Sequence, residues 1–185
     1  RSIAVLPLSN LTGDAEQDHY IDGLQDLLIT KLAHIPGLRV ISRQSTLRYR
    51  DSRRPTSDIA GELSVDALVV GSLLREGNRI EVTVQLIDGR SEEHLWADRY
   101  SQETPRVFTL ISDIANAIDA EITVETPQES HQLAYDPIGP VDTRAIDAYA
   151  LGIAHFDRFT REGIRAAIGQ FQAAVAIEPK FALAW

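Results

Sequence analysis

The first residues with potential for chemistry are acids near the amino terminus. Five carboxylates fall close together in sequence: Asp14, Glu16, Asp18, Asp22 and Asp26. The alternation at positions 14, 16 and 18 is similar to the start of a calcium-binding loop, but such a loop needs Gly at its sixth position and a bidentate Glu at its twelfth. His19 and Gln25 hold those positions. The acids are therefore expected to favour the positive amino end of a helix, and no calcium site is predicted.

The other chemistry-bearing residues form no catalytic or metal-binding pattern. The sequence has no Cys, its five His residues lack metal-ligand spacing, and it contains neither a Gly-rich nucleotide loop nor a Gly-x-Ser-x-Gly elbow. We therefore predict that the chain is not an enzyme and holds no cofactor and no metal. A hydrolase built from acids and hydroxyls distant in sequence is an alternative.

A polar loop after the first apolar strand is the candidate ligand site. It contributes Asn10, Gly13 and Asp14, and the following helix contributes Asp22 and Gly23. Ligands of open α/β sheets bind beyond the carboxyl ends of strands, which is where this loop lies. The structural interpretation is that these residues are of the types that make turns and helix starts.

One segment is basic although the whole chain is acidic. Residues 39–54 contain six Arg and one Asp, a local charge of +5 in a chain of net charge −9. The candidate partner-binding residues are Arg43, Arg48, Arg50, Arg53 and Arg54, which would fit the acidic surface of a protein partner. The alternative is a solvated strand edge whose charges prevent pairing between sheets. The negative net charge disfavours nucleic acid as a partner of this chain.

Hydrophobic periodicity predicts the elements that position these residues. Strands are expected at residues 3–6, 40–41, 67–70, 80–86 and 94–100, with helices at 20–35, 57–63 and from Thr104 to Ile118. Trp96 and Tyr100 are expected to pack between sheet and helix. This order predicts an α/β fold with a mixed sheet, in which parallel β-α-β crossovers come first and an antiparallel meander follows, with packed helices.

The chain divides into three parts. Residues 1–124 are predicted to form the α/β module, 125–141 a proline-containing linker, and 142–185 two amphipathic helices at 142–157 and 160–178. No run is long and apolar enough for a membrane span, and these residues show no cationic start followed by an apolar run of the kind found in signal peptides. Because the sequence has no Met and starts directly with a strand pattern at Arg1, we interpret it as a piece of a longer protein.

The α/β part resembles the TolB-like module found beside helical repeats in bacterial CadC-type regulators and cyclase-containing signalling proteins. The matching segments are residues 2–7, 10–14, 22–24, 36–43, 65–72, 85–88 and 94–97. The resemblance implies a non-catalytic α/β module in a sensor or regulator, following an effector domain and often a membrane span. It implies no shared set of ligand-binding residues.

The carboxyl-terminal part resembles the start of a tetratricopeptide repeat array. The matching residues are Leu151, Gly152, Ala167, Phe171, Ala174 and Pro179. Ala148 and His155 stand where the repeat has aromatic residues, and the turn is longer than the standard, so the repeat is atypical. Trp185 stands where a second repeat would begin. Since a single repeat cannot bury its apolar face alone, residues 142–185 are expected to lean on the α/β module or on a second copy of the chain.

Together these observations predict a regulatory, signal-input or protein-interaction fragment of a larger bacterial signalling or transcription-regulator protein. The alternative is a small-ligand sensor that uses the loop from Asn10 to Gly23. A protein partner or self-association is expected, without nucleic acid and without a membrane span in these residues. The compartment stays open: it is periplasmic if a membrane span precedes this piece in its parent protein, and otherwise cytoplasmic.

Overall fold

The computed structural model describes residues 1–123, 141–181 and 184. The predicted linker, apart from Val141, and the predicted repeat start at Trp185 therefore lie outside the described residues. The strands are β1 (Ser2–Val5), β2 (Ser9–Asn10), β3 (Arg39–Val40), β4 (Ala67–Glu76), β5 (Arg79–Asp88) and β6 (His94–Glu103). The helices are α1 (Asp18–Ala33), α2 (Arg43–Thr46), α3 (Thr56–Leu63), α4 (Val107–Thr123), α5 (Thr143–Phe156) and α6 (Arg161–Ile177), with short 3-10 turns η1 (Ala15–Gln17), η2 (Leu47–Tyr49) and η3 (Thr104–Arg106).

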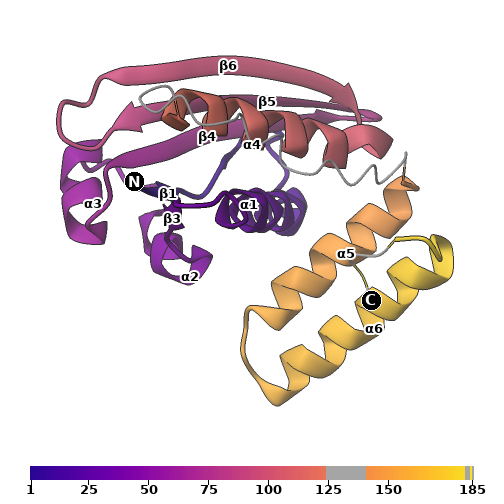
Figure 1. The fold of residues 1–185 in the computed structure, drawn as a ribbon. Coiled ribbons are helices and arrows are strands. Elements are labelled where there is room, and N and C mark those ends of the chain that lie inside the picture. The colour runs from indigo at the N-terminus through magenta and orange to yellow at the C-terminus, as the bar shows by residue number, and fades with distance from the viewer. Residues whose placement is uncertain (124–140, 182–183, 185) are drawn as a thin grey trace.

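The strands form one mixed sheet in the order β3-β1-β4-β5-β6, and the short strand β2 also pairs with β4. Strand β1 runs parallel to β3 and to β4, whereas β4, β5 and β6 form an antiparallel meander. The predicted fold class is therefore confirmed: parallel crossovers come first and the meander follows. Figure 1 shows this sheet with α1 and α4 lying along one of its faces.

Strand β1 shows why the sequence folds into layers. Its side chains alternate between two cores: Ile3 and Val5 pack into the main core with α1 and α4, and Ala4 packs into a smaller core beneath α3 and η2. Strand β5 instead buries Ile80 and its alternate neighbours as far as Leu86 on one face, while the residues between them are half-buried. A continuous apolar run and an alternating run therefore mark a strand covered on both faces and a strand covered on one.

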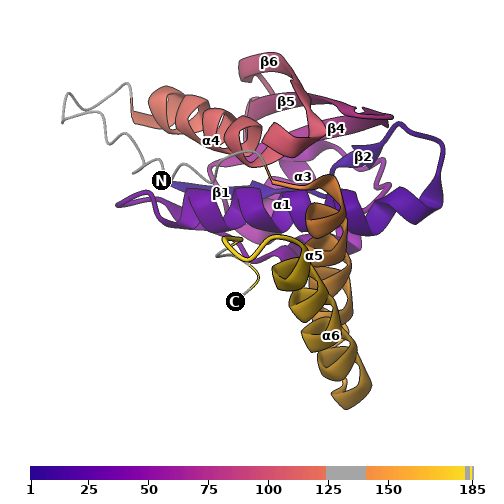
Figure 2. The same cartoon turned by 90° about the vertical axis from the view of Figure 1, so that its right-hand side faces the viewer.

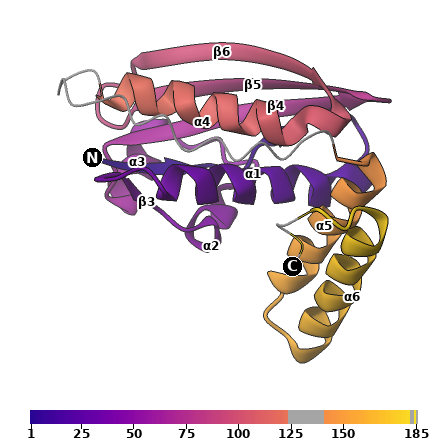
Figure 3. The same ribbon diagram turned by 45° about the vertical axis from the view of Figure 1, so that its right-hand side comes forward.

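The two carboxyl-terminal helices form a hairpin that projects from the α/β layer, with α5 crossing α1 (Figures 2 and 3). The hairpin is capped at both helix starts, because the Asp142 carboxylate accepts from the Arg144 N–H and the Thr160 hydroxyl accepts from the Gly163 N–H. The expectation that this part leans on the α/β module is met within one chain.

Hydrophobic periodicity did not predict three short elements, β2, α2 and η2. Strand β2 has two residues, and α2 and η2 follow β3 in a stretch where no element was predicted. They are held by tertiary contacts, since Thr46 and Tyr49 are buried although neither belongs to an amphipathic run. Trp96 and Tyr100 pack against the main core as expected, with ring centroids 6.3 Å apart. In the part of the chain that is described, none of the helices has the length and apolarity needed to span a bilayer.

Candidate functional site

The interior of the hairpin is built on one close crossing between its helices. A Cβ placed on Gly152 would lie 2.4 Å from the Phe171 ring, so this position admits no side chain unless the ring moves. Ala167 and Ala174 are buried in α6, Leu151 and Phe171 are half-buried, and Pro179 is exposed after the helix ends. Gly152 and Phe171 thus meet where α5 and α6 cross.

A second close crossing joins the hairpin to the α/β module, and we call it the α1–α5 interface. A Cβ on Gly23 of α1 would lie 3.0 Å from the Cα and 3.1 Å from the Cβ of Ala150 in α5. Aromatic rings extend the contact, since Phe181 packs on Phe108 of α4 at 5.1 Å and on Tyr149 of α5 at 5.2 Å between ring centroids. Because Phe181 is fully buried, the segment after α6 folds back into the main core.

Two sets of ion pairs border the α1–α5 interface. In the first, Arg75 at the end of β4 donates to both carboxylate oxygens of Asp147 in α5, at 2.7 and 3.3 Å. Its guanidinium also stacks on the Tyr20 ring at 4.3 Å. Desolvation is the largest single effect and disfavours the charged guanidinium, but the hydrogen bond to Asp147 together with the electrostatic interactions with Tyr20 and Asp147 outweighs it, so the pKa of Arg75 is raised. For the Tyr20 hydroxyl, burial raises the pKa, so Tyr20 stays neutral beside the pair of Arg75 and Asp147.

The second set centres on Arg43 of α2. Its guanidinium contacts the carboxylates of Asp22 in α1 and of Asp157 at the end of α5. Nearby, burial raises the pKa of Asp26, which Arg43 partly offsets. Burial, with the charge of Asp26 as a smaller cause, raises the pKa of Tyr149 to about 12. Three helices thus meet around one arginine.

The predicted basic residues that form ion pairs fall into two groups in the structure: arginines that pair with Asp22 and arginines that pair with Glu62 of α3. Arg43 is only 7% exposed, and Arg50 joins it in pairing with Asp22. Arg48 and Arg54 both bind Glu62 of α3, at 2.8 and 2.7 Å. Arg43 is thus less accessible to a partner than the other four arginines of the predicted set, because the folded chain uses its charge internally.

The strand-edge alternative for the same segment applies to Arg39 alone, because β3 lies at one edge of the sheet. Strand β3 has two residues and contains only Arg39 of the six arginines, while the others lie on α2, η2 and the turn that follows. Arg53 is exposed and forms no ion pair with any described residue. The basic surface that remains open consists of Arg48, Arg53 and Arg54, with Glu62 beneath it.

The candidate ligand loop is occupied by its own hydrogen bonds. Asn10 Nδ2 donates to the Asp14 carbonyl and to Asp18 Oδ1, and Asn10 Oδ1 accepts from both the N–H and the hydroxyl of Thr12. Asp14 caps η1 through the Glu16 N–H, and Gly13 turns the chain at a φ of +74°.

The helical members of that candidate set lie elsewhere. Asp22 faces Arg43 and Arg50, while Gly23 packs on Ala150. The five residues therefore do not converge on one ligand-sized site, and two of them serve the α1–α5 interface.

A cavity of about 550 Å³ opens near the start of β1. Its acids include Asp66, which accepts from the hydroxyl and N–H of Ser2, and Asp88, which accepts from N–H groups of the following turn. These hydrogen bonds lower the pKa of both carboxyls, first through the Ser2 hydroxyl for Asp66 and first through the Ser91 N–H for Asp88. Carboxylates held ionised in this way are poor general acids near neutral pH.

Among the described residues, no group of three His, Asp or Glu side chains could hold a metal ion. The residues that sequence analysis missed are Arg75, Asp147, Ala150 and Asp157. Arg75 and Asp147 lie in separate elements far apart in sequence, and nothing in their spacing links them. Sequence analysis gave Gly23 as a ligand-loop or helix-start residue, whereas the structure places it within α1 against Ala150.

The fold and its interface define an α/β module with an open mixed sheet that carries a helical hairpin. Residues 1–117 match the family described as HilA/YgeH-like transcriptional regulator, second domain. The chain belongs to this family. The family confirms that the α/β part is a regulator domain.

A relative and two solved structures are similar to the chain. Putative adenylate cyclase 3 of Rhizobium meliloti (strain 1021) is 36% identical over 152 residues, which are 79% of this chain and 25% of the relative. The chain thus spans about a quarter of that protein. Lipoprotein GNA1162 from Neisseria meningitidis has a TM-score of 0.49 at 16% identity, covering 63% of this chain and 96% of its own. TolB from Acinetobacter baumannii has a TM-score of 0.49 at 16% identity, covering 66% of this chain and 28% of its own.

Proposed function

We propose that the chain is a non-catalytic regulatory module whose α/β domain anchors the first helical hairpin of a tetratricopeptide array and sets its orientation. The α1–α5 interface carries this proposal. A hairpin of this kind is unstable alone because its apolar face needs a neighbour. Here α1 supplies that neighbour, so a change in the α/β domain at α1 would move the helices that follow.

The geometry favours a rigid connection over a flexible tether. Helix α5 packs so closely on α1 that a Cβ added at Gly23 would lie 3.0 Å from the Ala150 Cα. The flanking pairs made by Arg75 and Arg43 fix the rotation of α5 about this crossing, since each reaches a different end of the helix. Closely packed elements transmit displacement instead of absorbing it.

The finer part of the proposal places this module in a CadC-type or cyclase-linked signalling protein of bacteria. The supporting observations are the regulator family of residues 1–117 and the adenylate cyclase name of a relative four times as long as the matched part. In such a protein the output would come from another domain, and this chain would carry signal input or partner binding.

The absence of catalysis is tested directly on the 185-residue chain. We expect no turnover in assays of nucleotide cyclisation and of phosphoester, ester and peptide hydrolysis. Turnover that disappears when one carboxylate or hydroxyl is replaced would refute the non-catalytic assignment.

The anchoring role is tested in the full-length protein by measuring the output of its effector domain. We expect Gly23→Leu, which separates α5 from α1, to uncouple that output from its stimulus. Gly61→Leu adds the same side chain at an α3 position with nothing within 4 Å, and should leave the coupling intact. Equal coupling of stimulus to output in the unmodified protein, the Gly23→Leu variant and the Gly61→Leu variant would contradict the proposal.

The partner-binding part concerns the open basic surface of Arg48, Arg53 and Arg54. Reversal of Arg53 to Glu should weaken capture of an acidic protein partner while leaving the melting temperature nearly unchanged, because an exposed charge supports little stability. Arg165→Glu on the outer face of α6 is the matched control. Unchanged capture by the Arg53 variant would remove this surface from the proposal.

A further inference from the structure

Strand β6 forms one edge of the sheet along its full ten residues. It is last in the strand order, and no described strand pairs with its outer side. Figure 1 shows β6 as the outermost strand, with α4 against the face of the sheet and not across this edge. A long unpaired edge presents a row of backbone donors and acceptors to any second strand.

The pairing with β5 identifies which backbone groups face outward. The Thr104 N–H donates to the Asn78 carbonyl at 2.8 Å, which fixes the register just beyond the end of β6. Hydrogen-bonded pairs recur every two residues in an antiparallel ladder, so Gln102, Tyr100 and Asp98 bond to β5. The N–H and C=O groups of Arg99, Ser101 and Glu103 therefore point to the open edge.

An independent contact supports this assignment. The Arg99 N–H donates to the side chain of its neighbour Asp98, at 2.7 Å, and not to β5. One outward amide is thus capped by a local carboxylate. Charged groups at an edge protect against indiscriminate pairing.

The charges on β6 also select one specific partner. Arg99 and Glu103 are both exposed and lie on the same face, with Ser101 midway between them. If a second copy of β6 runs antiparallel with the two-fold axis at Ser101, each Arg99 lies directly opposite Glu103 of the other copy. Side chains opposite each other across an antiparallel pair are close enough to form ion pairs.

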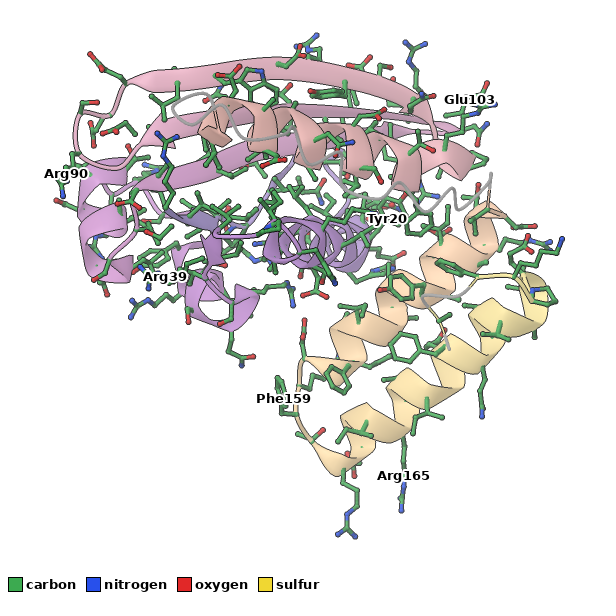
Figure 4. The ribbon with its side chains drawn as sticks, viewed as in Figure 1. Tyr20, Arg39, Arg90, Glu103, Phe159 and Arg165 are labelled. Carbon is green, nitrogen blue, oxygen red and sulfur yellow. The ribbon has the colours of Figure 1, made fainter. Side chains whose placement is uncertain are left out.

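Neighbouring registers lose this complementarity. Shifting the axis by one residue to Tyr100 places Arg99 opposite Ser101, and shifting it to Arg99 places two guanidinium groups against each other. Figure 4 marks Glu103 at the end of β6 that leads into η3, the turn that contacts α5. The proposed pairing uses residues 99–103 and none of the residues that form the α1–α5 interface.

We propose that two copies of this chain pair through β6, antiparallel over residues 99–103, with the two-fold axis at Ser101. The sheet then continues from one copy into the other through hydrogen bonds from Arg99, Ser101 and Glu103. Asp98 weakens this pairing, because its carboxylate must release the Arg99 N–H before that N–H can bond to the second strand. The occupant is a second copy, since the strand is its own charge complement.

Sedimentation equilibrium of the 185-residue chain tests the charge pattern. We expect a reversible dimer whose dissociation constant rises by about tenfold on Arg99→Glu, because reversal turns two attractive pairs into two repulsive ones. Glu103→Arg should weaken the dimer similarly, and the double reversal should restore it. Asp98→Ala should tighten the dimer by freeing the amide. Arg165→Glu makes the same charge change on α6 and should have no effect.

Disulfide cross-linking tests the register, and the lack of native Cys makes it unambiguous. Under mild oxidation Ser101→Cys should give a covalent dimer, because it lies on the axis. Ala97→Cys, on the same exposed face but outside the ladder, should cross-link far less. A chain that stays monomeric up to its solubility limit, a double reversal that fails to restore the dimer, or preferential cross-linking at position 97 would each overturn the proposal.

Discussion

Gly23→Ala measures how closely α5 is held against α1. In a helix interior this substitution gains about 1 kcal/mol from helix propensity alone. The new Cβ would lie 3.0 Å from the Ala150 Cα, and this atom belongs to the backbone and cannot rotate away. Helix α5 must therefore move, and overpacking of this kind costs about 1–3 kcal/mol. We expect a net loss of about 0–2 kcal/mol in the free energy of unfolding.

Gly61→Ala provides the matched control for this prediction. A Cβ there meets nothing within 4 Å, so only the favourable propensity change remains. Urea unfolding followed by circular dichroism should then separate the two substitutions by about 1–3 kcal/mol, with Gly61→Ala the more stable variant. Equal stabilisation by both would show that α5 does not lie against Gly23 as closely as the structure has it.

Two further predictions concern the hairpin and the half-buried acid Asp26 of α1. Gly152→Ala should destabilise the chain because its Cβ would meet the Phe171 ring. Gly169→Ala should stabilise the chain because its Cβ would have nothing within 4 Å. The same stability change in both variants would contradict the crossing of α5 and α6. Asp26→Asn should be more stable than the parent chain at pH 7. The pKa of folded Asp26 is raised by burial, so ionisation removes stability as the pH rises through that pKa. The advantage of Asn should shrink toward pH 4 in urea titrations, and a constant difference across this range would refute the cause given.

Sequence analysis predicted well those strands and helices whose hydrophobic pattern depends only on which of their own faces is buried. The alternation in β5 and the three- and four-residue spacing in α1 each follow from which face of one strand or helix is buried. The mixed sheet then follows from the order of these elements, because consecutive strands separated by a helix run parallel and hairpin-linked strands run antiparallel.

Features set by contacts between distant elements could not be predicted in this way. Arg43 looks like any exposed basic residue in sequence, and only the folded chain brings Asp22 and Asp157 to it. At Gly23 the sequence alone does not distinguish a ligand loop from a helix crossing. Strand periodicity predicted β6, but its role as an edge depends on the complete strand order.

Native-state hydrogen exchange of the intact chain tests the central claim most directly, because it compares the stability of α5 with that of α1 in one molecule. If the α/β domain anchors the hairpin, the most protected amides of α5 should exchange with nearly the same free energy of opening as those of α1. Gly23→Leu should lower the protection of α5 while leaving α1 largely protected. Amides of α5 that exchange at much lower free energy than those of α1 in the unmodified chain would show that the hairpin moves independently, and would contradict the account.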